Sequence, residues 1–289
     1  MNIRADATYV DATFGRGGHA QAVLDRLGAD GRLYAFDRDP EAIAVATDLA
    51  AADPRLVPRH AAFSALAATL GELDEPIAGI LFDLGISSPQ IDDPGRGFSF
   101  RHCGPLDMRM DPTTGQSAAA WLAEAAEAEI SEVLWHYGEE RRSRQIARLI
   151  VETRTHTAIE TTVQLAELVR SCVHQRGSRI DPATRTFQAI RMHVNDELGE
   201  LEAALDAALG LLGVGGRLLV IAFHSLEDRI VKQRFRALDD RRRENVREGV
   251  EIVPTYRTLT RKPIMIGEQE RSANPRARSA RLRALERIA

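Results

Sequence analysis

The chain contains few of the residues that stabilise secreted or zinc-binding proteins. Only two of its 289 residues are cysteines, Cys103 and Cys172, and they stand in separate parts of the sequence. Two isolated cysteines argue against the disulfide framework of a small exported domain and against the close ligand pairs of a structural zinc site. We therefore expect a cytoplasmic protein without a metal ion.

Long apolar runs are also absent. No stretch approaches the roughly 20 apolar residues needed to cross a bilayer, and the N-terminus has no basic segment followed by an apolar one. The composition, with 44% hydrophobic and 28% charged residues, is that of a soluble globular protein. Neither export nor a membrane location is expected.

The chain also lacks the excess of positive charge that a nucleic-acid partner suggests, since its formal net charge is -4. Its basic residues are nevertheless concentrated in two regions. They include Arg141, Arg142, Arg144 and Arg148, and, within residues 229–287, Arg241, Arg242, Arg243, Arg276, Arg278, Arg281 and Arg283. Such clusters indicate either phosphate contacts or solvated helix faces paired with nearby acids. Charge alone favours the second interpretation.

The hydrophobic pattern predicts two domains. Residues 8–83 alternate strand-like runs with amphipathic helical runs, which is typical of a parallel sheet, and Asp39-Pro40 is a typical helix start. Residues 112–191 show helical periodicity alone, and a strand resumes at residues 215–223. We expect an α/β, Rossmann-like domain formed by residues 1–111 and 192–289, with an all-helical domain inserted at 112–191. Residues 238–250 are polar enough to predict a loop.

A glycine-rich turn follows the first expected strand. Residues 11–19 read DATFGRGGH, and Asp37 ends the second strand. Glycines let the backbone approach a ligand, and a carboxylate at the tip of the second strand can accept hydrogen bonds from both ribose hydroxyls. The pattern is typical of an adenosyl cofactor site. Gly15, Gly17 and Ala20 also fit a dinucleotide pattern, so a nicotinamide-dependent oxidoreductase is an alternative.

Two further segments follow strands at the edge where open α/β sheets bind ligands. Asp83 ends the fourth strand and begins the segment DLGISSPQ; it is either a site residue or the cap of the next turn. His224 lies in FHSLEDR, directly after the strand that resumes the sheet. A histidine there can orient a base or relay a proton, although a structural role is more common.

Taken together, these segments resemble one family, the bacterial 16S rRNA (cytosine-N4)-methyltransferases called RsmH or MraW. Eight blocks carry the resemblance, in family order along almost the whole chain. They are DATFGRGGH, AFDRDPEAI, ILFDLGISSPQIDDPGRGFSF, GPLDMRMD, YGEERRSRQIAR, PATRTFQAIR, FHSLEDRIVK and NPRARSARLR. Eight such blocks are far more specific than a glycine-rich turn alone.

The resemblance implies S-adenosyl-L-methionine as cofactor and a cytidine of the 16S rRNA decoding region as substrate, in free rRNA or in the small ribosomal subunit. Matching positions assign seven residues to the cofactor: Gly17, Gly18 and His19 to its methionine part, Asp37 to its ribose, Phe63 to its adenine, and Asp83 and Gln90 to further contacts.

The chemistry expected is direct in-line transfer of the methyl group to the N4 amine, with a group that accepts the amine hydrogen. Asp83 is the first candidate for this acceptor and His224 a poorer one. The helical insert and the basic C-terminal segment are expected to hold RNA, and a homodimer through the insert is a further expectation. A non-catalytic RNA-binding assembly factor is the second alternative. Family members normally carry an additional N-terminal segment, so we expect an N-terminal lid to be missing.

Overall fold

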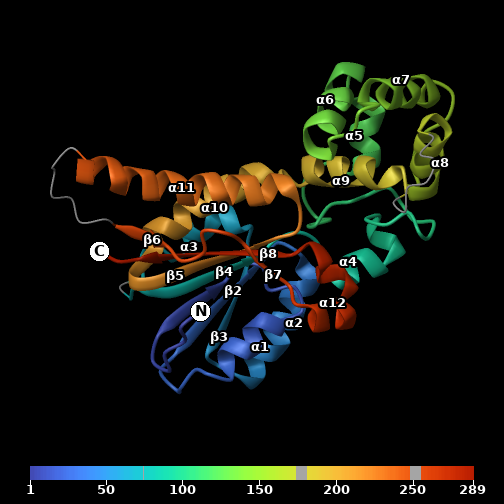
Figure 1. Cartoon of the computed structure of the whole chain (residues 1–289). Helices are drawn as coiled ribbons and strands as arrows, with labels where there is room; N and C mark the ends of the chain where they lie inside the picture. Colours follow the sequence, from blue (N-terminus) through green and yellow to red (C-terminus); the bar gives the residue numbers. More distant parts are fainter. Residues whose placement is uncertain (74, 174–180, 248–254) are drawn as a thin grey trace. The chain divides into compact units, whose positions relative to one another are not determined.

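The computed structural model describes residues 1–73, 75–173, 181–247 and 255–289 (Figure 1). The chain divides into two compact units, and each is described by itself. The first unit comprises Met1–Gly85 and Leu198–Ala289, and the second comprises Ile86–Glu197. The α/β fold class expected from the sequence is confirmed by the first unit.

The first unit is built on a sheet that, within the described residues, has the strand order β3-β2-β1-β4-β5-β8-β6, with β7 beside β8. Strands β1 to β5 are parallel, and β8 is antiparallel to β5. The strand bounds are β1 Thr8–Asp11, β2 Arg32–Asp37, β3 Leu56–His60, β4 Ile77–Asp83, β5 Leu212–Ala222, β6 Tyr256–Thr258, β7 Ile264–Met265 and β8 Arg281–Arg287.

Helices cover both faces of this sheet, as Figure 1 shows. Side chains alternate between the faces along each strand. Tyr9 and Leu33 therefore pack on one face with α1 and α2, while Val10 and Phe82 pack on the other with α10 and α11. The helices of this unit are α1 Gly18–Leu24, α2 Pro40–Ala52, α3 Leu66–Leu70, α10 Glu197–Leu211, α11 Ser225–Arg247 and α12 Glu268–Ala273, with 3-10 turns at Phe63–Ala65 and Pro275–Ser279.

Two local predictions have different outcomes. Asp39 caps α2 by accepting a hydrogen bond from the backbone N–H of Glu41, and Pro40 is the first helical residue, as expected. The loop expected at 238–250 is wrong for residues 238–247, which continue α11. Arginine, alanine and leucine are good helix formers, so polarity alone is a poor indicator of a loop. Residues 248–250 and the side chains of Arg241, Arg242 and Arg243 lie outside the described part.

The second unit is helical and has its own core. Its helices are α4 Ser88–Asp92, α5 Ala118–Glu124, α6 Glu127–Gly138, α7 Ser143–Arg154, α8 Thr162–Cys172 and α9 Ala183–Val194, with a 3-10 turn at Pro94–Arg96. Its core is formed by residues such as Leu122, Ile130 and Leu134 from these helices. Among the described residues of the whole chain, none of the helices has the length and apolar character that spanning a bilayer requires.

The boundaries of this helical unit differ from the expected 112 and 191. It begins at Ile86 because Phe98, Leu106 and Met108, which lie in irregular segments, pack into its core. It extends past residue 191 because the side-chain amide of Asn195 donates to the carbonyl of Met108 and accepts from the N–H of Met110, both at 2.7 Å. Irregular segments have no hydrophobic period, so the sequence pattern did not assign them.

A buried ion pair joins α11 to β8 in the first unit. Arg283 Nε donates to Asp228 Oδ1 at 2.7 Å, and both residues are buried. Arg281 Nη1 lies 3.3 Å from Asp228 Oδ2. Burial opposes ionisation of Asp228, but the hydrogen bonds and charges of Arg283 and Arg281 hold its pKa below the usual value. Two arginines expected to contact phosphate thus have a structural partner.

The variant Asp228→Asn is expected to lower the free energy of unfolding by about 3 kcal/mol, because it leaves Arg283 buried without a counter-charge. Chemical denaturation followed by circular dichroism measures the change. Asp206→Asn is the matched control, because Asp206 pairs with Arg234 at an exposed position of the same unit and should cost less than about 1 kcal/mol. Equal losses in the two variants would contradict the assignment.

Candidate functional site

Three aspartates lie on one face of the sheet at the carboxyl ends of neighbouring strands. Asp11 of β1 stands opposite Ala35 of β2 and Leu81 of β4. Asp37 and Asp83 each come two residues later on their own strands. Residues two apart on a strand point to the same face, so the parallel register brings all three carboxylates to one edge of the sheet, with Asp11 in the centre and deepest.

The glycine-rich loop after β1 closes over this edge. The N–H of Phe14 donates to the carbonyl of Phe36 at 2.9 Å, which ties the loop to β2. Gly17 has φ +78°, and a Cβ atom there would lie 2.8 Å from the Phe14 ring. Gly18 is different, because among the described residues no heavy atom other than those of its chain neighbours and of its own helix backbone lies within 4 Å of the position its Cβ would take. The loop therefore needs glycine at 17 for its conformation, while glycine at 18 leaves open space.

Asp37 is held by the loop and by the next helix start. Its Oδ2 accepts from the N–H of Gly15 at 2.8 Å, and its Oδ1 accepts from the N–H of Asp39 at 2.9 Å. Burial raises the pKa of Asp37, and these backbone hydrogen bonds oppose the shift. The backbone of Arg38 also donates to Asp37, and a carboxylate has about four acceptor sites, so Asp37 retains capacity for a further hydroxyl donor.

His19 and Asp83 are brought together. His19 Nε2 lies 3.3 Å from Asp83 Oδ2, and the His19 side chain is 48% exposed. The hydrogen bond to Asp83 is the main reason that the pKa of His19 is raised, against the effect of burial. The N–H of Asp83 donates to Thr13 Oγ1 at 2.7 Å. Thr13 was not among the site residues predicted from the sequence, although its hydroxyl joins the end of β4 to the loop.

Phe63 follows β3, next to the end of β2, because the N–H of Ala61 donates to the carbonyl of Asp37 at 3.0 Å. The Phe63 ring packs edge-on against Phe82, with centroids 5.6 Å apart. Its place beside the Asp37 strand end suits an aromatic ring near the base of a nucleoside whose ribose is held by Asp37.

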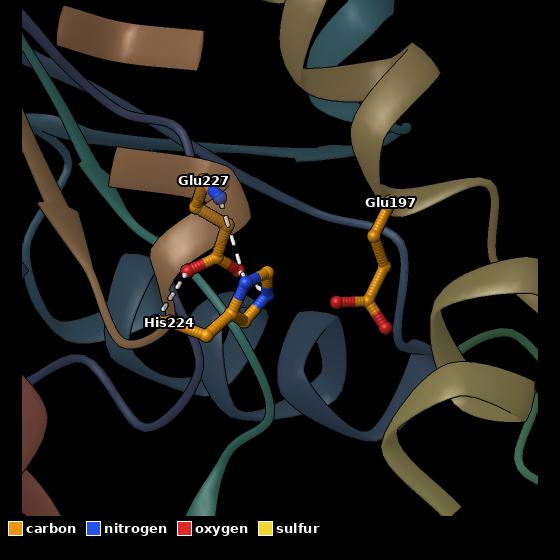
Figure 2. Close-up of side chains that lie close together, drawn as sticks. All are labelled: Glu197, His224 and Glu227. Carbon is orange, nitrogen blue, oxygen red and sulfur yellow. Dashed lines mark hydrogen bonds and ion pairs between the residues drawn. The ribbon is translucent and has the colours of Figure 1, made fainter. Parts of the chain in front are cut away.

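His224 directly precedes α11 and makes the contacts of a helix cap. Figure 2 shows Glu227 folded back toward it. The backbone N–H groups of Phe223 and His224 donate to Glu227 Oε2 at 2.9 and 3.3 Å, and His224 Nε2 lies 2.8 Å from Glu227 Oε1. The N–H of Glu227 donates in turn to His224 Nδ1 at 3.5 Å, so the two residues are arranged reciprocally, as in a capping box. Glu227 was a further residue that the sequence did not single out, although its position three after His224 is the signature of such a box.

Gln90 belongs to the helical unit. It is buried, and its Oε1 accepts from the N–H of Ser87 at 2.9 Å, while the Ser87 hydroxyl accepts from the N–H of Gln90. The pair forms a capping box at the start of α4. The structure therefore brings together the predicted residues of the first unit at one sheet edge and gives Gln90 a local role in the second.

A glycine-rich loop after β1 and carboxylates at the ends of β1, β2 and β4 define a Rossmann-like protein that binds an adenosyl cofactor. The chain belongs to the MraW methylase family, whose model matches residues 1–288. This membership confirms the resemblance seen in the sequence and decides against a nicotinamide-dependent oxidoreductase. The methyl donor of this methylase is S-adenosylmethionine.

Two relatives illustrate the similarity. The chain is 52% identical over 296 residues to the ribosomal RNA small subunit methyltransferase H of Xylella fastidiosa (strain M12), covering 100% of this chain and 93% of that protein. It is 52% identical over 290 residues to the protein of that name from Xanthomonas campestris pv. campestris (strain B100), covering 100% and 84%. A solved rRNA methylase from Streptococcus thermophilus is 11% identical, with a TM-score of 0.41, and the match covers 99% of this chain and 90% of that one.

The residues present fit this cofactor. Among the described residues, Asp11 Oδ2 and Asp83 Oδ1 are buried and have no hydrogen-bond partner. Buried polar atoms nearly always have one, so both oxygens indicate that a polar or cationic group completes the site. A sulfonium and an ammonium group meet that need, and the open space at Gly18 gives room for the chain that links them.

Gly18→Ala is expected to leave the free energy of unfolding within about 0.5 kcal/mol of the original and to weaken S-adenosylhomocysteine binding about tenfold or more, because the methyl group enters the space assigned to the cofactor. Thermal unfolding and isothermal titration calorimetry measure the two quantities. Gly17→Ala is the contrasting variant, since the left-handed conformation alone costs roughly 1–2 kcal/mol. Unchanged affinity in a folded Gly18→Ala protein would show that the cofactor lies elsewhere.

Proposed function

We propose that this protein transfers the methyl group of S-adenosylmethionine to the N4 amine of a cytidine in the decoding region of 16S rRNA. Its 52% identical relatives carry the name ribosomal RNA small subunit methyltransferase H, and its eight sequence blocks resemble the cytosine-N4 enzymes. The observation that carries the proposal is the Asp83–His19 pair at the cofactor edge, because it offers a proton acceptor with an outlet to solvent.

The cofactor supplies an electrophilic methyl group on a positively charged sulfur. The protein holds the donor through Asp37, Phe63 and the loop that contains Gly17 and Gly18, so that the incoming amine approaches in line with the bond that breaks. The nitrogen gains a bond to carbon and must lose a proton. Asp83 Oδ1 has no partner among the described residues and is the acceptor that we assign.

His19 completes the path of that proton. Its Nε2 lies 3.3 Å from the other oxygen of Asp83, and nearly half of its side chain is exposed. A proton accepted by Asp83 can therefore leave through the imidazole to water, which restores the carboxylate for the next cycle. His224 is the second candidate for the acceptor, since its Nε2 is also buried without a hydrogen-bond partner among the described residues, but the backbone hydrogen bonds that it exchanges with Glu227 favour a role in capping α11.

The helical unit is assigned to RNA recognition. Arg141, Arg144 and Arg148 are exposed around the start of α7, and Arg144 and Arg148 are one turn apart on the same side of the helix. Arg148 lies 3.8 Å from Glu127, a loose exposed pair. Arg142 differs, because its Nη1 donates to the carbonyl of Cys172 at 2.7 Å and is part of the fold. The exposed arginines suit the phosphates of an RNA strand.

A direct test incubates the purified protein and labelled S-adenosylmethionine with small ribosomal subunits, and separately with free 16S rRNA, both from a strain that lacks the enzyme. Mass spectrometry of nuclease fragments then locates the label. We expect one labelled cytidine in the decoding region, with the methyl group on N4. Label on C5 or on another base would refute the proposed site, and an absence of transfer would favour an RNA-binding assembly factor.

Asp83→Asn is expected to lower kcat by roughly 10² to 10⁴-fold, because an amide oxygen can accept a hydrogen bond but cannot take up the proton. The affinity for S-adenosylhomocysteine, measured by calorimetry, separates this effect from a loss of binding. His224→Asn is the matched comparison, because asparagine is a good helix cap and should leave kcat unchanged. If His224→Asn loses as much activity as Asp83→Asn, the histidine takes the proton instead.

The double variant Arg141→Gln, Arg144→Gln is expected to weaken RNA binding and to reduce the slope of log affinity against log salt by about two, because each arginine neutralises one phosphate. Filter binding of the RNA substrate at several salt concentrations gives the slope. The control is Arg26→Gln, Arg32→Gln, which removes the same charge from exposed positions of the first unit. An identical slope in both double variants would show that Arg141 and Arg144 do not contact the RNA phosphates.

A further inference from the structure

Asp11 is a buried carboxyl group that the proposed mechanism does not use. It ends β1, and its side chain is 1% exposed. Its Oδ1 accepts from the N–H of Thr13 at 3.2 Å. Its Oδ2 has no hydrogen-bond partner among the described residues. A fully buried carboxyl oxygen without a partner is costly, so the fold retains it for a reason other than stability.

The groups that face Asp11 come from each element beside it at this edge. They are His19 from α1, Asp37 from β2 and Asp83 from β4. Among these groups, three are carboxyl groups (Asp11, Asp37 and Asp83) and one, His19, is an imidazole, which is already paired with Asp83. Burial, above all, raises the pKa of Asp11 to about 7; the Thr13 hydrogen bond and His19 oppose the rise, while Asp83 and Asp37 add to it. Without a further positive charge, Asp11 holds a proton below neutral pH.

We propose that Asp11 is a specificity-determining residue that makes the site prefer the charged cofactor, S-adenosylmethionine, over its neutral-sulfur product, S-adenosylhomocysteine. The inference rests on the proposed function in that it assumes the sulfonium group lies at this edge. When the sulfonium is present, Asp11 gives up its proton to solvent, and the carboxylate and the sulfonium attract each other. When the methyl group has been transferred, the sulfur is neutral and Asp11 takes a proton up again.

This exchange favours product release. The two ligands share their adenosine and amino-acid parts and differ in the methyl group and its positive charge. Contacts to the shared parts change the affinities for both ligands equally. A buried carboxylate beside the sulfonium group changes only the affinity for S-adenosylmethionine. Because one pKa unit of interaction corresponds to a tenfold change in affinity, a shift of about one unit at Asp11 gives a preference for the substrate form that rises with pH and reaches about tenfold above neutral pH.

The test is calorimetric titration of the full-length protein with each ligand at pH 6.5, in two buffers that differ in ionisation enthalpy. We expect S-adenosylmethionine to release about half a proton more than S-adenosylhomocysteine, as follows when the sulfonium lowers the pKa of Asp11, about 7 in the ligand-free protein, by about one unit. In Asp11→Asn this difference should disappear and the preference for S-adenosylmethionine should fall about threefold at this pH, where Asp11 is only partly ionised, with little change for S-adenosylhomocysteine. An equal loss of affinity for both ligands would indicate a merely structural role and would overturn the inference.

A second measurement does not require the variant to fold. In the unaltered protein, the ratio of the two dissociation constants should increasingly favour S-adenosylmethionine as pH rises through about 7, because the carboxylate fraction of Asp11 rises. The series is repeated in His19→Gln, which removes the imidazole as a source of the same trend, and the trend should persist. If the ratio of dissociation constants does not change with pH in either protein, the role proposed for Asp11 is overturned, while the proposed function is unaffected. If neither ligand binds, the cofactor site itself is wrong and the proposed function fails with it.

Discussion

The parallel register of β1, β2 and β4 is the constraint on which the site depends. It brings Asp11, Asp37 and Asp83 to one face at the end of three neighbouring strands. The loop after β1 then uses these strand ends as anchors, with Gly15 bonded to Asp37 and Thr13 to the backbone of Asp83. A slip of one residue in any of these strands would turn its aspartate to the other face, so sheet pairing and site assembly are one event.

The arginine clusters separate into structural and exposed members. Arg283 is buried against Asp228 and fixes β8 to α11, and Arg142 bonds to a carbonyl at the end of α8. Arg141 and Arg144 remain exposed on the helical unit. The net charge of the chain therefore says little about its partner, because buried arginines are offset by buried acids and the exposed ones act locally.

Much of the first unit was predictable from sequence, because strand-helix alternation and the caps at Asp39 and Pro40 are local signals. The strand ends also located Asp37, Asp83 and His224 correctly at one edge. The limits of the helical unit were not predictable, since Phe98 and Met108 enter its core from irregular segments that have no period. The roles of Thr13 and Arg283 depend on contacts with residues distant in the sequence, which a linear pattern does not contain, whereas the spacing of His224 and Glu227 is a local signal.

We propose that the edge formed by β1, β2 and β4 holds S-adenosylmethionine with its methyl group directed outward to an amine. A crystal structure of the complex with S-adenosylhomocysteine would locate the cofactor relative to these strand ends. We expect the ribose hydroxyls on Asp37, the adenine beside Phe63, and the sulfur close to Asp11 and Asp83, above Gly18. A ligand bound away from these strand ends, or with its ribose on another carboxylate, would show that the site is wrongly assigned.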